Sequence, residues 1–151
     1  MTTSGAARTR ALGRRIGRLL RAGDVVLLQG PLGAGKTTLA QGIGAGLGVE
    51  GPVNSPTFVL LARHDAGLPL YHADLYRLTE PAQVAELALA EQATDGVLLV
   101  EWPERGIEAL PAEHLLIVFE LPEGDAKQRR ITIVAMGERY HRVLDGLGGR
   151  G

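Results

Sequence analysis

A glycine-rich segment, residues 30–38, constrains the fold of this chain more than any other part of the sequence. It follows the apolar run Val25–Gln29 and fits the pattern G-x-x-x-x-G-K-[ST] at Gly30, Gly35, Lys36 and Thr37. Because glycine has no Cβ, such a loop can turn its backbone N–H groups inward onto phosphate oxygens. A helix that begins at the end of the loop adds unpaired N–H groups and the positive end of its dipole. The segment therefore predicts a site for the phosphates of a nucleotide.

A chance match is the alternative, since the chain contains 21 glycines. Two observations argue against it. The segment lies between an apolar strand and a helical pattern, which is the context that the motif requires. Lysine is also scarce: Lys36 and Lys127 are the only lysines among 16 basic residues, so a lysine stands where the forked guanidinium of arginine would not fit. We therefore expect the phosphates to contact Gly30, Leu32, Gly33, Ala34, Gly35, Lys36, Thr37 and Thr38.

The length and composition are those of one globular domain. The 151 residues allow a proper core, and the 45% hydrophobic and 22% charged fractions are ordinary. A net charge of −1 gives no global field that would draw the chain to nucleic acid or a membrane. The chain has no cysteine, which fits the cytoplasm, and no apolar run of about 18 residues that could span a membrane. We expect a single domain over residues 1–151, with disorder at residues 1–5 and 148–151.

The N-terminal segment, from about Ala6 to Arg21, has an apolar stripe at helical spacing and no acidic residue. Its polar face consists of six arginines: Arg8, Arg10, Arg14, Arg15, Arg18 and Arg21. Such a face occurs in transit peptides and RNA-binding helices, and also in helices that cover a sheet and keep a solvated basic side. We favour the last interpretation, because the helix runs without a linker into the strand that begins at Val25.

The remainder of the chain alternates predicted strands and helices. The strands are Val25–Gln29, Val59–Arg63, Leu70–His72, Val97–Glu101, Leu115–Leu121 and Arg130–Ala135. The helices run from near Lys36 to Gly48, from an N-cap at Thr79 to about Gln92, and over Glu138–Leu147. The glycines Gly42, Gly44 and Gly46 leave the first of these helices dependent on packing. The pattern predicts an α/β, single-domain, P-loop NTPase-like fold of three layers, with a mostly parallel central sheet and an antiparallel edge.

Oxygen ligands for magnesium are expected near the loop. Lys36 would supply a cation for the β- and γ-phosphates, and Thr37 a hydroxyl for the metal. Glu101 ends a continuous apolar run, which is typical of a buried parallel strand beside the loop strand, so its carboxylate would face magnesium or the attacking water. Asp74 ends another strand, although taken alone it fits a turn or a helix cap better than a site. Thr57 is a candidate switch residue that senses the γ-phosphate.

The sequence distinguishes between several classes of phosphate-loop protein. A GTPase would read guanine with Asn-Lys-x-Asp, but the only asparagine is Asn54, and Ser55 follows it. A small-molecule kinase needs a lid with arginines, and no separate insertion supplies one. Arg63, Arg77 and Arg105 could serve, so the kinase stays open as an alternative. A pure nucleotide-binding module would not need Glu101 near the γ-phosphate.

Four segments together resemble one family closely. They are Gly30–Thr38, Ser55–Phe58 (S-P-T-F), His72–Leu78 (H-A-D-L-Y-R-L) and Val100–Arg105 (V-E-W-P-E-R). Their order and spacing are similar to those of the TsaE family, the bacterial ATPase of tRNA threonylcarbamoyladenosine biosynthesis. The resemblance covers roughly residues 9–120, and its D-L-Y-R and E-W-P-E motifs are far more specific than the glycine-rich loop.

The resemblance implies a small ATPase that is weak alone, uses ATP and Mg²⁺, and acts with TsaD and TsaB. Those partners place threonylcarbamoyl on adenosine 37 of ANN-decoding tRNAs, so tRNA would be met only through the complex, and no membrane is involved. By the same resemblance Thr57 lies in a switch-like segment, and Asp74 and Glu101 serve the metal and the hydrolytic water, with Lys36 beside them. Trp102 would be a functional aromatic residue, although a core tryptophan is an equal alternative.

Two positions depart from the family pattern. Phe58 stands where a tyrosine is frequent, and Ala88 stands where a glycine is common. Neither residue belongs to the expected phosphate chemistry.

Overall fold

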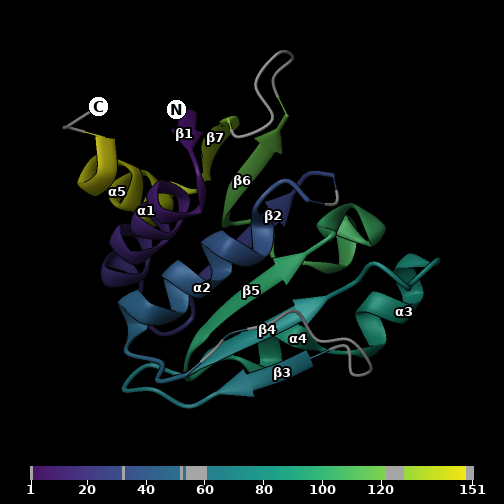
Figure 1. The fold of residues 1–151 in the computed structure, drawn as a ribbon. Helices are drawn as coiled ribbons and strands as arrows, with labels where there is room; N and C mark the ends of the chain where they lie inside the picture. Colours follow the sequence, from purple (N-terminus) through teal and green to yellow (C-terminus); the bar gives the residue numbers. More distant parts are fainter. Residues whose placement is uncertain (1, 32, 52, 54–60, 122–127, 149–151) are drawn as a thin grey trace.

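The computed structural model describes residues 2–31, 33–51, 53, 61–121 and 128–148. Leu32, Thr57 and Phe58 therefore lie outside the described residues. Within them, seven strands form one sheet in the order β1-β7-β6-β2-β5-β4-β3 (Figure 1).

Four parallel strands form the centre of this sheet. They are β6 (His114–Glu120), β2 (Val25–Gln29), β5 (Val97–Glu101) and β4 (Leu70–Asp74). On one side β7 (Gln128–Met136) and β1 (Thr2–Ser4) are added antiparallel, and on the other side β3 (Leu61–His64) pairs antiparallel with β4. The mixed sheet is confirmed, but both of its edges are antiparallel, where the sequence indicated one.

The N-terminal strand corrects the expectation of disorder at residues 1–5. Thr2–Ser4 pair with β7 in the register Thr2↔Arg130, because the outer edge of β7 offers unpaired backbone groups. The buried hydroxyls of Thr3 and Thr9 lie 2.8 Å apart, which ties β1 to the helix that follows it. At the other end, Gly148 is the last residue of a helix, and residues 149–151 lie outside the described residues.

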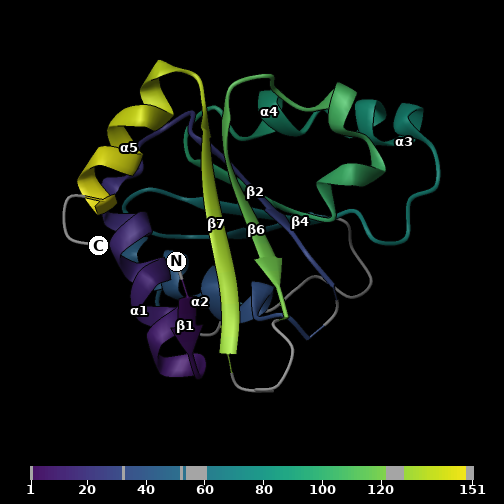
Figure 2. The same cartoon turned by 90° about the horizontal axis from the view of Figure 1, so that it is seen from above.

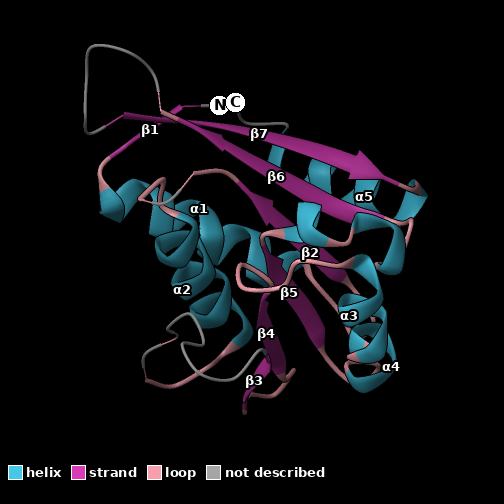
Figure 3. Cartoon of the chain, turned by 90° about the vertical axis from the view of Figure 1, so that its right-hand side faces the viewer, coloured by secondary structure: helices cyan, strands magenta, loops and turns pink. Residues whose placement is uncertain are grey.

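Helices cover both faces of the sheet, which confirms the three layers. Alternate residues of β2 point to opposite faces, as the pleat requires. Val26 and Leu28 join the core cluster under α1 (Ala6–Leu19), α2 (Lys36–Leu47) and α5 (Glu138–Gly148). Val25 and Leu27 join the cluster under α3 (Pro81–Glu86) and α4 (Leu89–Gln92). In Figure 3, α1 and α2 lie on one side of the sheet and α3 and α4 on the other.

Four glycines bring α1 and α2 into close contact. A Cβ on Gly13 would lie 2.4 Å from the carbonyl oxygen of Leu39, and a Cβ on Gly42 would lie 2.2 Å from that of Arg10. Gly17 and Gly46 make equivalent approaches one turn further along. α2 therefore packs closely against α1 at its glycines, and its dependence on this packing stays a prediction.

The arginines of α1 point away from this contact. Arg8, Arg14 and Arg18 are exposed, while the Arg15 guanidinium donates to the carbonyl oxygen of Leu147 at 2.9 Å. That bond joins α1 to α5, which lies beside it (Figure 2). The helix is thus an integral layer of the domain, as favoured from the sequence. Among the described residues, no helix has both the length and the apolar character needed to cross a membrane.

The single helix predicted from Thr79 to Gln92 is wrong in two respects. Glu80, not Thr79, is the N-cap, and it forms a capping box with Gln83. The helix then breaks at Ala88, which has φ 47° and ψ 48°, so that α3 and α4 are separate. Left-handed backbone cannot continue a right-handed helix, and nothing in the hydrophobic pattern marks the break.

Candidate nucleotide-binding site

The glycine-rich loop joins β2 to α2 and keeps three glycines at positive φ. The φ angles are 155° at Gly30, 77° at Gly33 and 102° at Gly35, and Gly35 is the N-cap of α2. A Cβ on Gly30 would also lie 2.8 Å from the Cβ of Phe119 on β6. The loop therefore needs glycine for its backbone conformation and for its close contact with β6. Successive N–H groups in such a conformation, followed by a helix N-terminus, make a concave anion site.

The side chain of Lys36 folds back over this loop. Its Nζ donates to the carbonyl oxygen of Gly30 at 2.7 Å and lies 3.7 Å from the centroid of the Trp102 ring. The residue is 5% exposed, and burial lowers the pKa of the ammonium, while the charges of Glu101, Glu104 and Asp74 act in the opposite direction. A phosphate oxygen is a stronger acceptor than a carbonyl, so the lysine is placed to move onto a bound phosphate.

The two predicted acids lie side by side next to the loop. Asp74 and Glu101 are paired in register on β4 and β5, and Glu101 is also in register with Leu28 of the loop strand. The expected neighbourhood of the β5 strand and the loop strand is thus confirmed. Burial, and secondarily the charge of Glu101, raises the pKa of the Asp74 carboxyl, although the Tyr76 N–H that donates to it at 3.0 Å acts in the opposite direction.

Sequence reasoning missed one partner of Glu101. The Nε2 atom of His72 lies 2.7 Å from an Oε atom of Glu101, and the two residues are 0% and 3% exposed. A signal was present, because His72 and Asp74 are two residues apart on a strand and share a face. That face is the one covered by α2.

Trp102 lies at the surface of the site and not in the interior of the core. It is half-buried, has φ 59° and ψ 49°, and packs its ring 4.8 Å from that of Tyr76. The left-handed backbone directly after Glu101 turns the chain so that the indole faces Lys36. The Arg105 guanidinium lies 5.8 Å from the indole centroid, so a cation borders the aromatic pair as well.

The loop has a second partner that the sequence did not indicate. The Arg129 guanidinium, on β7, donates to the carbonyl oxygen of Gly33 at 3.2 Å across 96 residues of sequence. Ala34 is buried, and Thr37 and Thr38 are half-buried in the first turn of α2. Of the arginines considered for a kinase lid, Arg63 is engaged elsewhere, with Asp65 and Tyr71 near the amino end of β4.

The oxygen ligands beside the loop suit magnesium better than a metal ion that is coordinated by protein side chains alone. The described residues contain no group of three or more His, Cys, Asp or Glu side chains that could hold an ion. Magnesium typically takes one or two protein oxygens together with phosphates and water. The hydroxyl of Thr37 and the carboxylate of Glu101, beside a phosphate loop, match that requirement.

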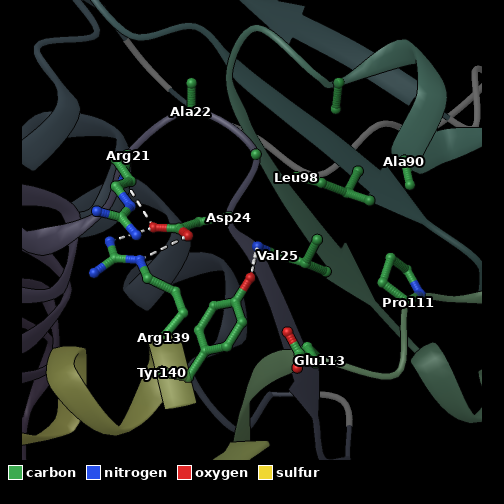
Figure 4. Close-up of a pocket in the computed structure, with 12 residues that line it drawn as sticks. Arg21, Ala22, Asp24, Val25, Ala90, Leu98, Pro111, Glu113, Arg139 and Tyr140 are labelled. Carbon is green, nitrogen blue, oxygen red and sulfur yellow. Dashed lines mark hydrogen bonds and ion pairs between the residues drawn. The ribbon is translucent and has the colours of Figure 1, made fainter. Parts of the chain in front are cut away.

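A cavity of about 370 Å³ lies at the other end of β2 (Figure 4). Asp24 and Arg139 form an ion pair at 2.7 Å in its wall, and the Tyr140 hydroxyl accepts from the Val25 N–H at 2.8 Å. The Asp24 carboxylate also accepts from the backbone N–H of Arg21. These polar groups are engaged with one another and fasten α5 to the start of the sheet, so we assign the cavity a structural role.

The fold and the loop define a class of protein. A glycine-rich G-x-x-x-x-G-K-T loop between a central parallel strand and a helix, with acids at the ends of the next two strands, is the architecture of the phosphate-loop proteins. The family model "Threonylcarbamoyl adenosine biosynthesis protein TsaE" matches residues 3–131. The chain belongs to the TsaE family.

Similar proteins agree with this assignment. A tRNA threonylcarbamoyladenosine biosynthesis protein TsaE of Streptomyces coelicolor is 45% identical over 137 residues, which is 87% of this chain and 93% of that protein. Its counterpart of the same name in Bacillus subtilis is 41% identical and is matched over 92% of this chain and 87% of its own length. The crystal structure of Bacillus subtilis YdiB superposes with a TM-score of 0.83 at 36% identity and covers 99% of this chain and 93% of that one.

Proposed function

We propose that this protein binds and hydrolyses ATP with Mg²⁺, in support of the threonylcarbamoyl modification of adenosine 37 in tRNA. The names of its relatives support the pathway. The observation that carries the chemistry is the placement of Glu101, whose buried carboxylate is in register with the loop strand and acts electrostatically on Lys36. Such an arrangement brings an acid, a cation and a phosphate-binding loop to one edge of the sheet.

Each residue of the site has a role in this proposal. The loop from Gly30 to Thr38 holds the phosphates, with Lys36 on the β- and γ-phosphates. Thr37 and Glu101 would hold magnesium, which would supply positive charge against the charge that develops on the phosphate oxygens. Water attacks the γ-phosphorus, the bond to the β-phosphate oxygen breaks, and the proton of the water passes to a carboxylate. Asp74 suits that last step, because a raised pKa makes a carboxylate a stronger proton acceptor.

We propose the remaining roles on the basis of family membership. Thr57 would complete the site as a switch residue, and Trp102 would contact the nucleotide or shield it. TsaD and TsaB would be the protein partners that raise turnover, tRNA would be contacted only through their complex, and the protein would work in the cytoplasm. The small-molecule kinase is the competing activity.

Phosphate release from ATP by the purified protein, with and without TsaB and TsaD, tests the proposal. Hydrolysis should need no added acceptor and should rise when the partners are present. Transfer of phosphate to a small metabolite, with no release to water, would favour the kinase.

Variants of the loop and of the acid make the test specific. Lys36→Ala should fold normally and lose most hydrolysis, because no cation remains for the γ-phosphate.

Glu101→Gln should keep ATP affinity and lose hydrolysis on the order of 100-fold, because the amide retains the shape of the side chain without its charge. Full activity in Glu101→Gln would show that this acid is structural.

A further inference from the structure

We propose that His72 is a positioning residue that holds the carboxylate of Glu101 in its working orientation. The inference rests on the proposed function, since it assigns a purpose to Glu101 in ATP hydrolysis. The geometry that carries it is the 2.7 Å contact between His72 Nε2 and Glu101 Oε2, made between two neighbouring strands.

The sheet itself places the histidine. β4 and β5 are parallel and paired, with His72 opposite Leu99 and Asp74 opposite Glu101. His72 therefore lies one pleat before Glu101 on the same face of the sheet, within reach of a side chain that folds back along its strand. Asp74, on the same strand and face as His72, occupies the position directly beside Glu101.

Because both side chains are buried, the contact between His72 and Glu101 affects the orientation of the carboxylate. His72 is 0% exposed and Glu101 is 3% exposed, so neither side chain relies on bulk water for its hydrogen bonds. A buried carboxylate is costly unless donors satisfy it, and a donor fixed on another strand also removes rotamer freedom from the glutamate. A carboxylate held in place gives magnesium and water a fixed partner, and no reorganisation is needed during the reaction.

The second ring nitrogen indicates which atom carries the proton. His72 Nδ1 is buried without a hydrogen-bond partner among the described residues. A buried N–H without an acceptor is costly, so the proton belongs on Nε2, from which the ring donates to the carboxylate of Glu101. The histidine acts on the reaction only through this hydrogen bond.

Amide replacements of different length test the proposal on the full-length protein. In His72→Gln the amide nitrogen can reach the place of Nε2, whereas in His72→Asn it reaches only the place of Nδ1. We expect His72→Asn to lower kcat for phosphate release at least 10-fold, with KM for ATP within about two-fold of wild type, and His72→Gln to restore most of kcat. His64→Gln is the control, because His64 lies half-buried on the neighbouring strand β3 and has no assigned role in the site, so its replacement should leave kcat unchanged.

A double variant separates positioning from mere stability. In a Glu101→Gln background, His72→Asn should cause no further loss of kcat, because the carboxylate that it positions is already gone. The melting temperature of each variant should be measured together with its kcat. If His72 is only structural, its replacement should lower the melting temperature equally in the wild-type and Glu101→Gln backgrounds.

The outcomes distinguish failure of the positioning role from failure of the proposed function. Equal kcat in wild type, His72→Asn and His72→Gln would overturn the positioning role while leaving the proposed function intact, provided that Glu101→Gln is inactive. Equally low kcat in the two folded His72 variants, or a full additional loss in the Glu101→Gln background, would also overturn it. If Glu101→Gln is fully active, the proposed function and the positioning role both fail.

Discussion

Asp74 illustrates the conflict between stability and chemistry at a single residue. Burial raises the pKa of its carboxyl, so the folded protein is less stable when Asp74 is ionised than when it is protonated. Asp74→Asn keeps the acceptor for the Tyr76 N–H and removes the charge. We expect the variant to melt at a higher temperature than wild type near neutral pH and to hydrolyse ATP more slowly.

The raised pKa of Asp74 also predicts how the stability difference between Asp74→Asn and wild type depends on pH. Because the pKa is raised, the stability associated with the protonated form is present at low pH and is lost as pH rises through the folded-state pKa. The difference in melting temperature between Asp74→Asn and wild type should therefore shrink as pH falls through that pKa. A difference that grows in acid would contradict the assignment.

Ala88 carries backbone strain that a glycine would relieve. Its φ of 47° lies in the left-handed region, where a Cβ is unfavourable and glycine is not. We expect Ala88→Gly to stabilise the fold by about 0.5–1 kcal/mol in urea denaturation, after the extra entropy of glycine in the unfolded chain is deducted. Ala45→Gly, at an exposed position inside α2, is the control and should destabilise by about 1 kcal/mol.

At the scale of elements, the contact between α1 and α2 depends on its glycines. An added methyl at Gly13 or Gly42 would overlap a backbone carbonyl, which cannot move aside as a flexible side chain can. We expect Gly13→Ala and Gly42→Ala each to cost about 1–3 kcal/mol, although alanine is the better helix former. Gly67→Ala is the control, since a Cβ there meets nothing within 4 Å among the described residues. Equal stability of Gly13→Ala and wild type would show that the helices can separate without cost.

This contact also links the packing to the site. α2 begins at Lys36, directly after the loop, and a Cβ on Gly35 would lie 3.8 Å from the Thr9 methyl of α1. A helix pair pushed apart by one methyl group would shift the N–H groups that we propose contact the phosphates. The glycine variants that still fold should therefore bind ATP more weakly as well.

At the scale of the whole molecule, the ion pair of Asp24 and Arg139 joins the last helix to the first central strand. Asp24 is buried, and the Arg139 guanidinium also donates to the carbonyl oxygen of Leu19 at 2.9 Å, so one side chain links α1, β2 and α5. We expect Arg139→Ala to cost about 2–4 kcal/mol in urea denaturation, because a buried carboxylate loses its counter-ion. ATP affinity should hardly change, since the pair lies at the end of β2 remote from the loop.

Arg142→Ala serves as the comparison for this pair. Arg142 lies 3.9 Å from Glu138 on the exposed face of the same helix, where an ion pair contributes about 0–0.5 kcal/mol. Similar losses for the two arginines would mean that α5 is held by its apolar face, with Tyr140 and Val143, and not by the ion pair.

Local sequence was sufficient for the central part of this protein. The boundaries Val25–Gln29 and Val97–Glu101 were predicted as observed, because continuous apolar runs of five residues bounded by turn residues suit buried parallel strands. The loop and the start of α2 followed from a motif whose spacing is set by backbone chemistry within nine residues. The acids Asp74 and Glu101 could be placed at one edge because parallel strands end together.

The tertiary structure decided what depends on contacts between distant residues. β1 pairs with the edge that β7 leaves unpaired, and Arg129 reaches Gly33 because β7 returns beside the loop. The bond from His72 to Glu101 spans 29 residues and depends on the register of two strands, which no local pattern specifies. Sequence by itself determined the central strands, the loop and the candidate phosphate-binding residues, because these follow from short-range backbone chemistry. Only the folded sheet determined which side chains support them, because pairing and register are properties of elements brought together by the whole chain.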